Sequence, residues 1–150
     1  MIYLGADHRG FELKQKLFQR LKDEGMMVSD LGNDHLDPND DYPDFAEKVA
    51  EATVSSLENK GILLCGSGVG VDMVANKVPG VRAALVDDVT VARQSREHED
   101  VNVISLPADV LDEEEAWNII KIFLSTPFSG DERHIRRLEE VKDIEEKHAK

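Results

Sequence analysis

Short apolar runs alternate with longer amphipathic segments along this chain, and this alternation limits the fold more than any other feature. Each of five apolar runs is followed by a segment with apolar residues at helical spacing. Strands that alternate with helices form a parallel sheet with helices on both faces. We therefore predict an α/β fold with a five-stranded parallel sheet. The predicted strands lie at residues 1–5, 26–32, 61–65, 81–86 and 101–106.

The charge balance and the cysteine count exclude several classes of partner. The 31 acidic residues outnumber the 18 basic ones, which gives a net charge of −13. This charge repels phosphate backbones and anionic lipids, so neither nucleic acid nor a membrane is an expected partner. One cysteine cannot form an internal disulfide, and no apolar run approaches the ~20 residues of a membrane span. With no basic segment preceding a long apolar stretch, we expect a soluble cytoplasmic protein.

Polar residues directly after the predicted strands are the first candidates for a site. In parallel sheets, ligands bind beyond the carboxyl ends of the strands, where the strand order reverses. Asp7 and His8 follow the first strand as an acid–imidazole pair. In the structural alternative, His8 caps a helix and Asp7 binds loop amides. Their position at a ligand-facing edge favours the functional interpretation.

The sequence CGSGVG at residues 65–70 follows the third strand and contains Gly66, Gly68 and Gly70. Glycines allow consecutive N–H groups to point into one cavity, where a phosphate or an oxyanion can bind. The alternative is a tight strand-to-helix turn in which the glycines only permit close packing. The loop lacks the Gly-Lys-Ser/Thr ending of a P-loop, and its spacing disfavours a dinucleotide site.

Four further residues have both a functional and a structural interpretation. Cys65 is either a buried structural thiol or, facing amide donors, a base or nucleophile. His98 ends a predicted helix, where the helix dipole alone accounts for an imidazole. Arg133 and Arg137 share a helix face and suit a phosphate dianion, although such residues usually pair with neighbouring glutamates.

The histidines show no metal-ligand spacing, so we predict no metal site. Asp44, the last residue of the polar loop at 33–44, is the expected N-cap of the helix that follows.

Taken in order, these motifs resemble the RpiB/LacA/LacB family of sugar-phosphate isomerases, whose best-known members are the type B ribose-5-phosphate isomerases. The matching stretches, from residue 2 to about residue 140, are GADHRGFELK, DYPDFAEKVAEA, GILLCGSGVGVDMVANKVPGVRAAL, ARQSREH and LSTPFSGDERHIRRL. The resemblance implies a Rossmann-like three-layer αβα sandwich and a single isomerase domain over residues 1–150. It also implies no cofactor, and a homodimer or tetramer whose active sites each take residues from two chains. A carboxyl-terminal helix at about 131–148 is expected to pack on the partner subunit.

The resemblance also implies roles for individual residues. Cys65 is expected to move a proton between C1 and C2 of the open-chain sugar, and His98 to act as the acid that opens the ring. Ser67 and the loop amides are expected to hold the enediolate oxygen. The expected substrate-binding residues are Asp7, His8, Tyr42, Gly66, Ser67, Gly68, Val69, Gly70, Glu99, Arg133 and Arg137.

The sequence departs from the family pattern at Glu99, where members usually carry Asn, and at Asp109, where they usually carry Arg. Both changes add negative charge where a phosphorylated sugar is expected. The leading reaction is conversion of ribose 5-phosphate to ribulose 5-phosphate through a cis-enediolate. The alternatives are isomerisation of another aldose phosphate, such as a hexose 6-phosphate or a tetrose phosphate, and a sugar-phosphate-binding module with impaired catalysis. Retention of Cys65, Ser67 and His98 together favours an enzyme.

Overall fold

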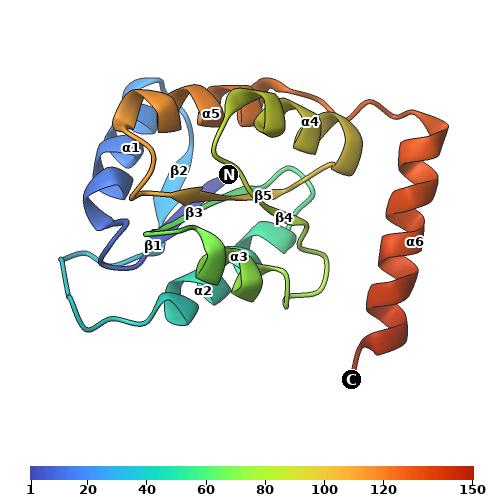
Figure 1. The fold of residues 1–150 in the computed structure, drawn as a ribbon, viewed down its shortest axis with the longest axis horizontal. Coiled ribbons are helices and arrows are strands. Elements are labelled where there is room, and N and C mark those ends of the chain that lie inside the picture. Colours follow the sequence, from blue (N-terminus) through green and yellow to red (C-terminus); the bar gives the residue numbers. More distant parts are fainter.

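The five strands form one parallel sheet in the order β2-β1-β3-β5-β4, in a computed structural model that describes residues 1–150 (Figure 1). Every pair of neighbouring strands is parallel. The predicted α/β fold with a five-stranded parallel sheet is confirmed. The strands are β1 (Ile2–Ala6), β2 (Val28–Asp30), β3 (Lys60–Cys65), β4 (Ala83–Leu85) and β5 (Val103–Pro107).

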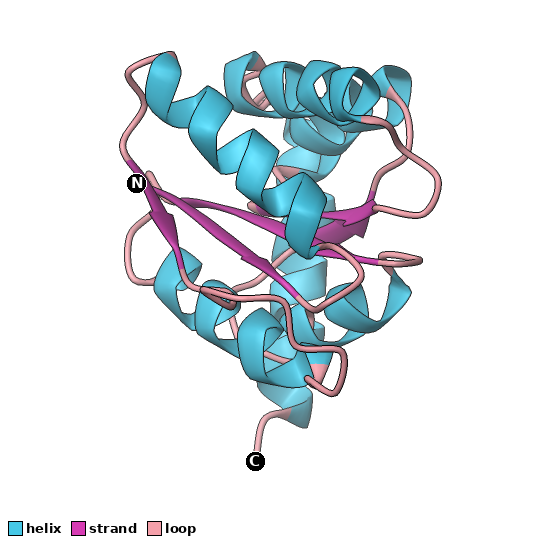
Figure 2. Cartoon of the chain, turned by 90° about the vertical axis from the view of Figure 1, so that its left-hand side faces the viewer, coloured by secondary structure: helices cyan, strands magenta, loops and turns pink.

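Six helices accompany the sheet, and none of them combines the length and the apolar character that crossing a membrane requires. They are α1 (Phe11–Asp23), α2 (Tyr42–Val54), α3 (Val69–Ala75), α4 (Val89–Glu99), α5 (Glu113–Ser125) and α6 (Glu132–His148). Helices α1, α4 and α5 cover one face of the sheet, and α2 and α3 cover the other, which gives three layers (Figures 1 and 2).

Alternate side chains of the central strands enter two separate apolar cores. Ile62 and Leu64 of β3 pack in the core under α1, α4 and α5. Leu63 and Cys65 of the same strand pack on the opposite side, in the core under α2 and α3. Because β3 contributes to both cores, its sequence is apolar throughout, as expected for a strand buried on both faces.

The strand order reverses between β1 and β3. The chain leaves β1 toward β2 on one side and then crosses back to β3 on the other side. Ala6 lies opposite Leu64 in the register of these two strands, so both strands end at the same level. Ligands of such sheets bind outside the carboxyl ends of strands at this point. The residues that follow β1 and β3 therefore share one edge.

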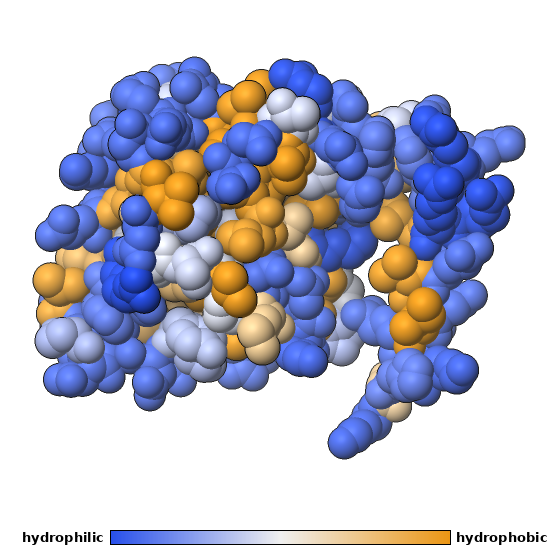
Figure 3. All heavy atoms as spheres, in the orientation of Figure 1, coloured by the Kyte–Doolittle hydropathy of each residue, from blue (hydrophilic) through white to orange (hydrophobic).

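Helix α6 stands to the side of the layers, next to α4 (Figure 1). His134 is its only buried residue, and the Glu145 carboxylate accepts the Gly80 N–H at 3.1 Å. The helix is highly charged, yet Val141 and Ile144 are exposed. Figure 3 shows apolar side chains along α6 on the side that faces the body of the molecule.

Helix α2 begins earlier than predicted. Its N-cap is Asp41, so the prediction of Asp44 as the N-cap was wrong. Tyr42 and Pro43 form the first turn instead. Proline favours this position because its φ is already near the helical value and its missing N–H has no partner in a first turn. Asp44 lies one residue further into the same turn.

Candidate active site

The turn after β1 brings Asp7 beside the end of β3. The Asp7 N–H donates to the Leu64 carbonyl at 3.4 Å, which extends the contact between the two strands beyond their last residues. The buried Asp7 carboxylate accepts the N–H groups of Arg9 at 3.0 Å and Gly10 at 3.3 Å. Asp7 therefore binds loop amides, as its structural alternative predicted, and also lies at the edge where a ligand is expected.

Cys65 is the last residue of β3, and its side chain is 5% exposed. Its Sγ accepts the N–H of Gly68 at 3.1 Å. Gly68 makes this possible with a φ of 76°, in the left-handed region that favours glycine. A Cβ at this position would lie 3.2 Å from the backbone of Leu106. The glycine turn thus directs a backbone donor at the sulfur, which suits an atom that carries negative charge during proton transfer.

The loop after Cys65 carries N–H groups that are free to bind an anion. The N–H groups of Gly66, Ser67 and Gly70 donate to no acceptor within the chain. The N–H of Val69 donates to the Ser67 hydroxyl at 3.2 Å, and Ser67 itself is exposed. Free donors that follow a strand end can hold a developing oxyanion without reorganisation.

His8 is held by Asp40, a residue that sequence reasoning missed. Its backbone N–H donates to Asp40 Oδ1 at 3.0 Å, and its ring Nδ1 lies 2.8 Å from the same oxygen. The carboxylate favours the tautomer with hydrogen on Nδ1, which leaves Nε2 available to a ligand. The His8 side chain is 31% exposed whereas that of Asp40 is 6% exposed. Asp40 therefore fixes the ring, and His8 faces the open edge.

A buried lysine anchors the loop that carries Asp40. The Lys14 side chain is fully buried, and its Nζ donates to Asp30 at 2.7 Å and to the Asn33 carbonyl at 2.7 Å. The Asn33 side chain in turn donates to Asp40 Oδ2. His8 is thus connected through hydrogen bonds to the core side of α1. The sequence signal for the burial of Lys14 was its helical spacing, since Lys14 shares the buried face of α1 with Leu17 and Leu21.

Tyr42 lies beside the glycine loop, where it was predicted to line the pocket. Its ring covers Gly70, and a Cβ at position 70 would lie 2.7 Å from the ring. Tyr42 is 38% exposed, so its hydroxyl can reach a ligand at this edge. A side chain at position 70 would displace the ring from this place.

Arg9 occupies the other side of the loop. Its guanidinium lies against Gly66, where any Cβ would collide with it. The same group forms an ion pair with Asp109, which lies two residues after the end of β5. Sequence reasoning did not select Arg9, although it follows β1 just as His8 does. Asp109, which the family comparison marked as an added negative charge, is paired with a cation.

His98 and Arg133 lie in a different region of the chain from Cys65. Both line a pocket of about 350 Å³ together with Phe128 and His134. Helix α4 starts after the carboxyl end of β4 and ends before β5 begins, so His98, near its last turn, lies at the opposite edge of the sheet from Cys65. Eleven helical residues span about 16 Å. Arg137 follows Arg133 by one turn on α6 and is exposed.

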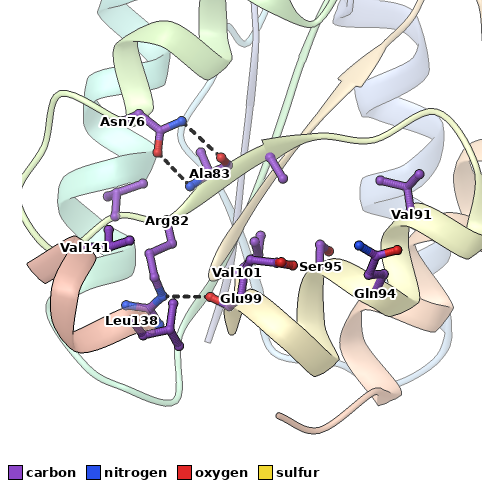
Figure 4. Close-up of a pocket in the computed structure, with 12 residues that line it drawn as sticks. Asn76, Arg82, Ala83, Val91, Gln94, Ser95, Glu99, Val101, Leu138 and Val141 are labelled. Carbon is purple, nitrogen blue, oxygen red and sulfur yellow. Dashed lines mark hydrogen bonds between the residues drawn. The ribbon is translucent and has the colours of Figure 1, made fainter. Parts of the chain in front are cut away.

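Glu99 lies in an apolar groove between β4, α4 and α6, which Figure 4 shows. The groove has a volume of about 410 Å³, and Leu138 and Val141 of α6 contribute to its lining. The Arg82 Nε donates to the Glu99 carbonyl at 3.2 Å. Within one chain, the predicted site residues therefore form two groups. Asp7, His8, Tyr42 and residues 65–70 lie together, whereas His98, Glu99, Arg133 and Arg137 lie around α4 and α6.

One partly buried acid next to the loop was not anticipated. Burial raises the pKa of Asp72 on α3 above its usual value, and the neighbouring Ser105 hydroxyl on β5 opposes this shift. Asp72 Oδ1 and Ser105 Oγ are both shielded from solvent without a well-formed hydrogen bond. The carboxyl is therefore destabilised in its charged form.

Asp7, His8 and Asp40 are the residues that could offer a cation three ligand atoms, within 4.8 Å of one another. Their atoms are already engaged in hydrogen bonds, from Arg9 and Gly10 to Asp7 and between His8 and Asp40. This arrangement orients the imidazole and the turn rather than presenting free ligands.

Comparison with known proteins identifies relatives along nearly the whole chain. Residues 2–141 match the family model for ribose/galactose isomerase. The chain is 41% identical over 147 residues to ribose-5-phosphate isomerase B of Mycobacterium tuberculosis, covering 98% of this chain and 91% of that protein. It is 42% identical over 140 residues to a probable ribose-5-phosphate isomerase B of Mycoplasma pneumoniae, covering 93% of this chain and 91% of that protein.

Solved structures of similar proteins share the fold closely. The ribose-5-phosphate isomerase B of Mycoplasma genitalium, with bound ribulose-5-phosphate, matches with a TM-score of 0.93 at 42% identity, covering 99% of this chain and 97% of that one. The enzyme of Clostridium thermocellum matches with a TM-score of 0.93 at 42% identity, covering 99% of both chains.

Proposed function

The chain belongs to the ribose/galactose isomerase family, and we propose on this basis that it interconverts ribose 5-phosphate and ribulose 5-phosphate. The family and the relatives make it an aldose–ketose isomerase of phosphorylated sugars. The observation that carries the proposal is the position of Cys65. Its sulfur lies where the strand order reverses, next to the free N–H groups of Gly66 and Ser67, and beside the turn after β1.

This arrangement supports proton transfer through a cis-enediolate. The Cys65 thiolate takes the proton from C2 of the open-chain aldose and returns it to C1, while the hydroxyl proton passes from O2 to O1. Negative charge develops on the sugar oxygens, and the N–H groups of Gly66 and Ser67 donate to it. Asp7, His8 and Tyr42 bind the sugar. The reaction needs a base, hydrogen-bond donors to the developing oxyanion and a group that binds the phosphate, so no cofactor is required.

The proposal includes a second chain in each site. His98, Arg133 and Arg137 are remote from Cys65 within one chain, so in the proposed homodimer, or in a tetramer of two dimers, His98 of the partner subunit opens the sugar ring. Arg133 and Arg137 of the partner subunit bind the phosphate. The exposed apolar side of α6 supports this assembly, with residues 131–148 packing on the partner. A free cysteine that acts as a base must stay reduced, which favours a cytoplasmic location.

Incubation with a panel of aldose phosphates in D₂O tests the proposal. Ribose 5-phosphate should yield ribulose 5-phosphate with deuterium at C1, followed by NMR, and Cys65→Ala should abolish the exchange. The panel includes a hexose 6-phosphate and a tetrose phosphate, because Glu99 and Asp109 differ from the residues usual in the family. Faster turnover of either alternative would replace ribose 5-phosphate as the substrate. Absence of turnover on every sugar would refute the enzymatic function.

A further inference from the structure

Two contacts hold Arg9 across the open side of the loop at residues 65–70. Its backbone N–H donates to the Asp7 carboxylate at 3.0 Å, which fixes the turn after β1. Its guanidinium then lies on the Cα side of Gly66 and pairs with Asp109 after β5. The side chain therefore crosses the end of β3, which lies between β1 and β5 in the sheet. This geometry depends on glycine at position 66, since any Cβ there would displace the guanidinium.

The Asp109 contact leaves most of the guanidinium unused. Of its five N–H donors, only those on Nη2 take part in a hydrogen bond, and the Nε and Nη1 donors have no acceptor in the chain. The Arg9 side chain is 55% exposed and that of Asp109 is 46% exposed, so both groups are accessible from solvent. A guanidinium with a free edge binds phosphate through two parallel hydrogen bonds.

The charges around the site make this cation important for an anionic substrate. The chain has a net charge of −13, and Asp7, Asp40 and Asp109 all lie near the carboxyl edge that carries Cys65. A phosphate dianion is repelled by these carboxylates unless a cation lies within a few ångströms. Arg9 is in contact with both the loop and one of the carboxylates, so it offsets that repulsion from within the same chain.

We infer that Arg9 binds the phosphate group of the sugar substrate and that Asp109 is the counter-ion of Arg9, whose negative charge competes with the phosphate for this cation. The inference rests on the proposed function and deepens it, because it adds a phosphate ligand from the chain that supplies Cys65. The role of Asp109 also changes. Its charge is partly offset by the guanidinium over Gly66, so the phosphate competes with an ion pair and does not meet a free carboxylate.

Steady-state kinetics combined with calorimetric titration of inorganic phosphate test the inference. In Arg9→Ala, KM for ribose 5-phosphate and Kd for inorganic phosphate should both rise about tenfold, with kcat changed much less. Arg9→Lys keeps the charge but loses the planar fork, so it should restore part of the affinity. Asp109→Asn keeps the guanidinium and removes its counter-charge, so inorganic phosphate should bind more tightly than to the wild type.

The opposite effects of the two substitutions separate phosphate binding from structural support. If the ion pair only supports the turn, Arg9→Ala and Asp109→Asn should change KM and Kd in the same direction by similar factors, which would overturn the inference. Unchanged values in Arg9→Ala would also overturn it. Arg20→Ala removes a guanidinium from the ion pair with Glu114, between α1 and α5, and serves as the control with unaltered phosphate binding. The phosphate titration does not depend on turnover, so a failed substrate assignment remains distinguishable from a failed Arg9 assignment.

Discussion

The imidazole of His98 packs against that of His134, with ring centroids 4.4 Å apart and ring planes inclined by 31°. His98 lies in the last turn of α4 and His134 in the first turn of α6, so this contact joins the two helices. The ring of His134 is 4% exposed, and its Nδ1 lies 2.7 Å from the Ser129 hydroxyl. The loop before α6 therefore fixes one imidazole, and that imidazole supports the proposed acid.

Replacement of His134 should impair ring opening through the position of His98. We expect His134→Ala to lower kcat by about tenfold with a smaller effect on KM, because a poorly oriented acid transfers protons less efficiently. His134→Phe keeps an aromatic ring under His98 and should recover part of the rate. His148→Ala, at the exposed end of the same helix, is the control. Wild-type kinetics in His134→Ala would contradict the positioning role.

Subunit mixing should reveal whether one site uses two chains. Cys65→Ala and His98→Ala should each be inactive as a homodimer, since each lacks one half of every site. After joint refolding of equal amounts, about a quarter of the wild-type activity should return, because about half of the dimers are mixed and each contains one complete site. A mixture that stays inactive would place both residues in the same chain's site.

The Asp40 carboxylate should control the affinity and reactivity of the site through His8. We expect Asp40→Ala to lower kcat/KM for ribose 5-phosphate by about tenfold, since two hydrogen bonds to a charged group are lost. Asp40→Asn retains an oxygen acceptor and should lose less. Asp34→Ala removes an exposed carboxylate from the same loop and should leave the kinetics unchanged. Equal kcat/KM in Asp40→Ala and the wild type would exclude the positioning of His8.

The buried Lys14–Asp30 pair should contribute strongly to stability. We expect Lys14→Met to lower the free energy of unfolding by roughly 3–5 kcal/mol, because Asp30 would keep a charge in a partly buried place without a partner. The double substitution Lys14→Met with Asp30→Asn should cost less than the single one. Urea denaturation measures both, with Lys16→Met on the exposed face of α1 as the control. A larger loss in the double variant would contradict the pairing.

Asp72 should make stability fall as the pH rises. Burial raises the pKa of Asp72 in the folded state, so the folded protein binds this proton more tightly than the unfolded chain does. Stability from this group is therefore complete below the usual carboxyl pKa and declines as the pH rises through the folded-state pKa. Asp72→Asn should raise the free energy of unfolding at neutral pH, and this gain should shrink in acid. A gain independent of pH would show that the charge is not responsible.

The sheet and its helices were predictable because their signals are local. The apolar run that ends at Cys65 and the apolar spacing along α1 both reflect which neighbouring residues are buried. This pattern is visible in the sequence itself. The start of α2 was misplaced because Asp44 and Asp41 are equally good caps, and only Pro43 distinguishes them. Lys14 was overlooked because a lysine usually marks the solvated face of a helix, whereas here Asp30 compensates its charge in the interior.

The contacts that complete the site could not be predicted in the same way. Arg9 and Asp109 are separated by 100 positions, and they meet only because β3 lies between β1 and β5. The pairing of His98 with His134 depends on how α6 returns to α4, for which the sequence carries no periodic signal. That the residues after the strands lie together was predictable, since strand ends share an edge in any parallel sheet. Which of them touch one another depends on the strand order.

Cys65 is the only cysteine of the chain, and its sulfur is nearly closed to solvent while it accepts the Gly68 N–H. Every thiol-specific label therefore reports on a single atom, the sulfur of the proposed base. The number of equivalents of an alkylating agent bound per chain gives the fraction of chains with an intact Cys65. The labelling rate measures how often the glycine turn opens and exposes the sulfur. Protection by a sugar phosphate would then measure occupancy of that centre in any variant, including those without turnover.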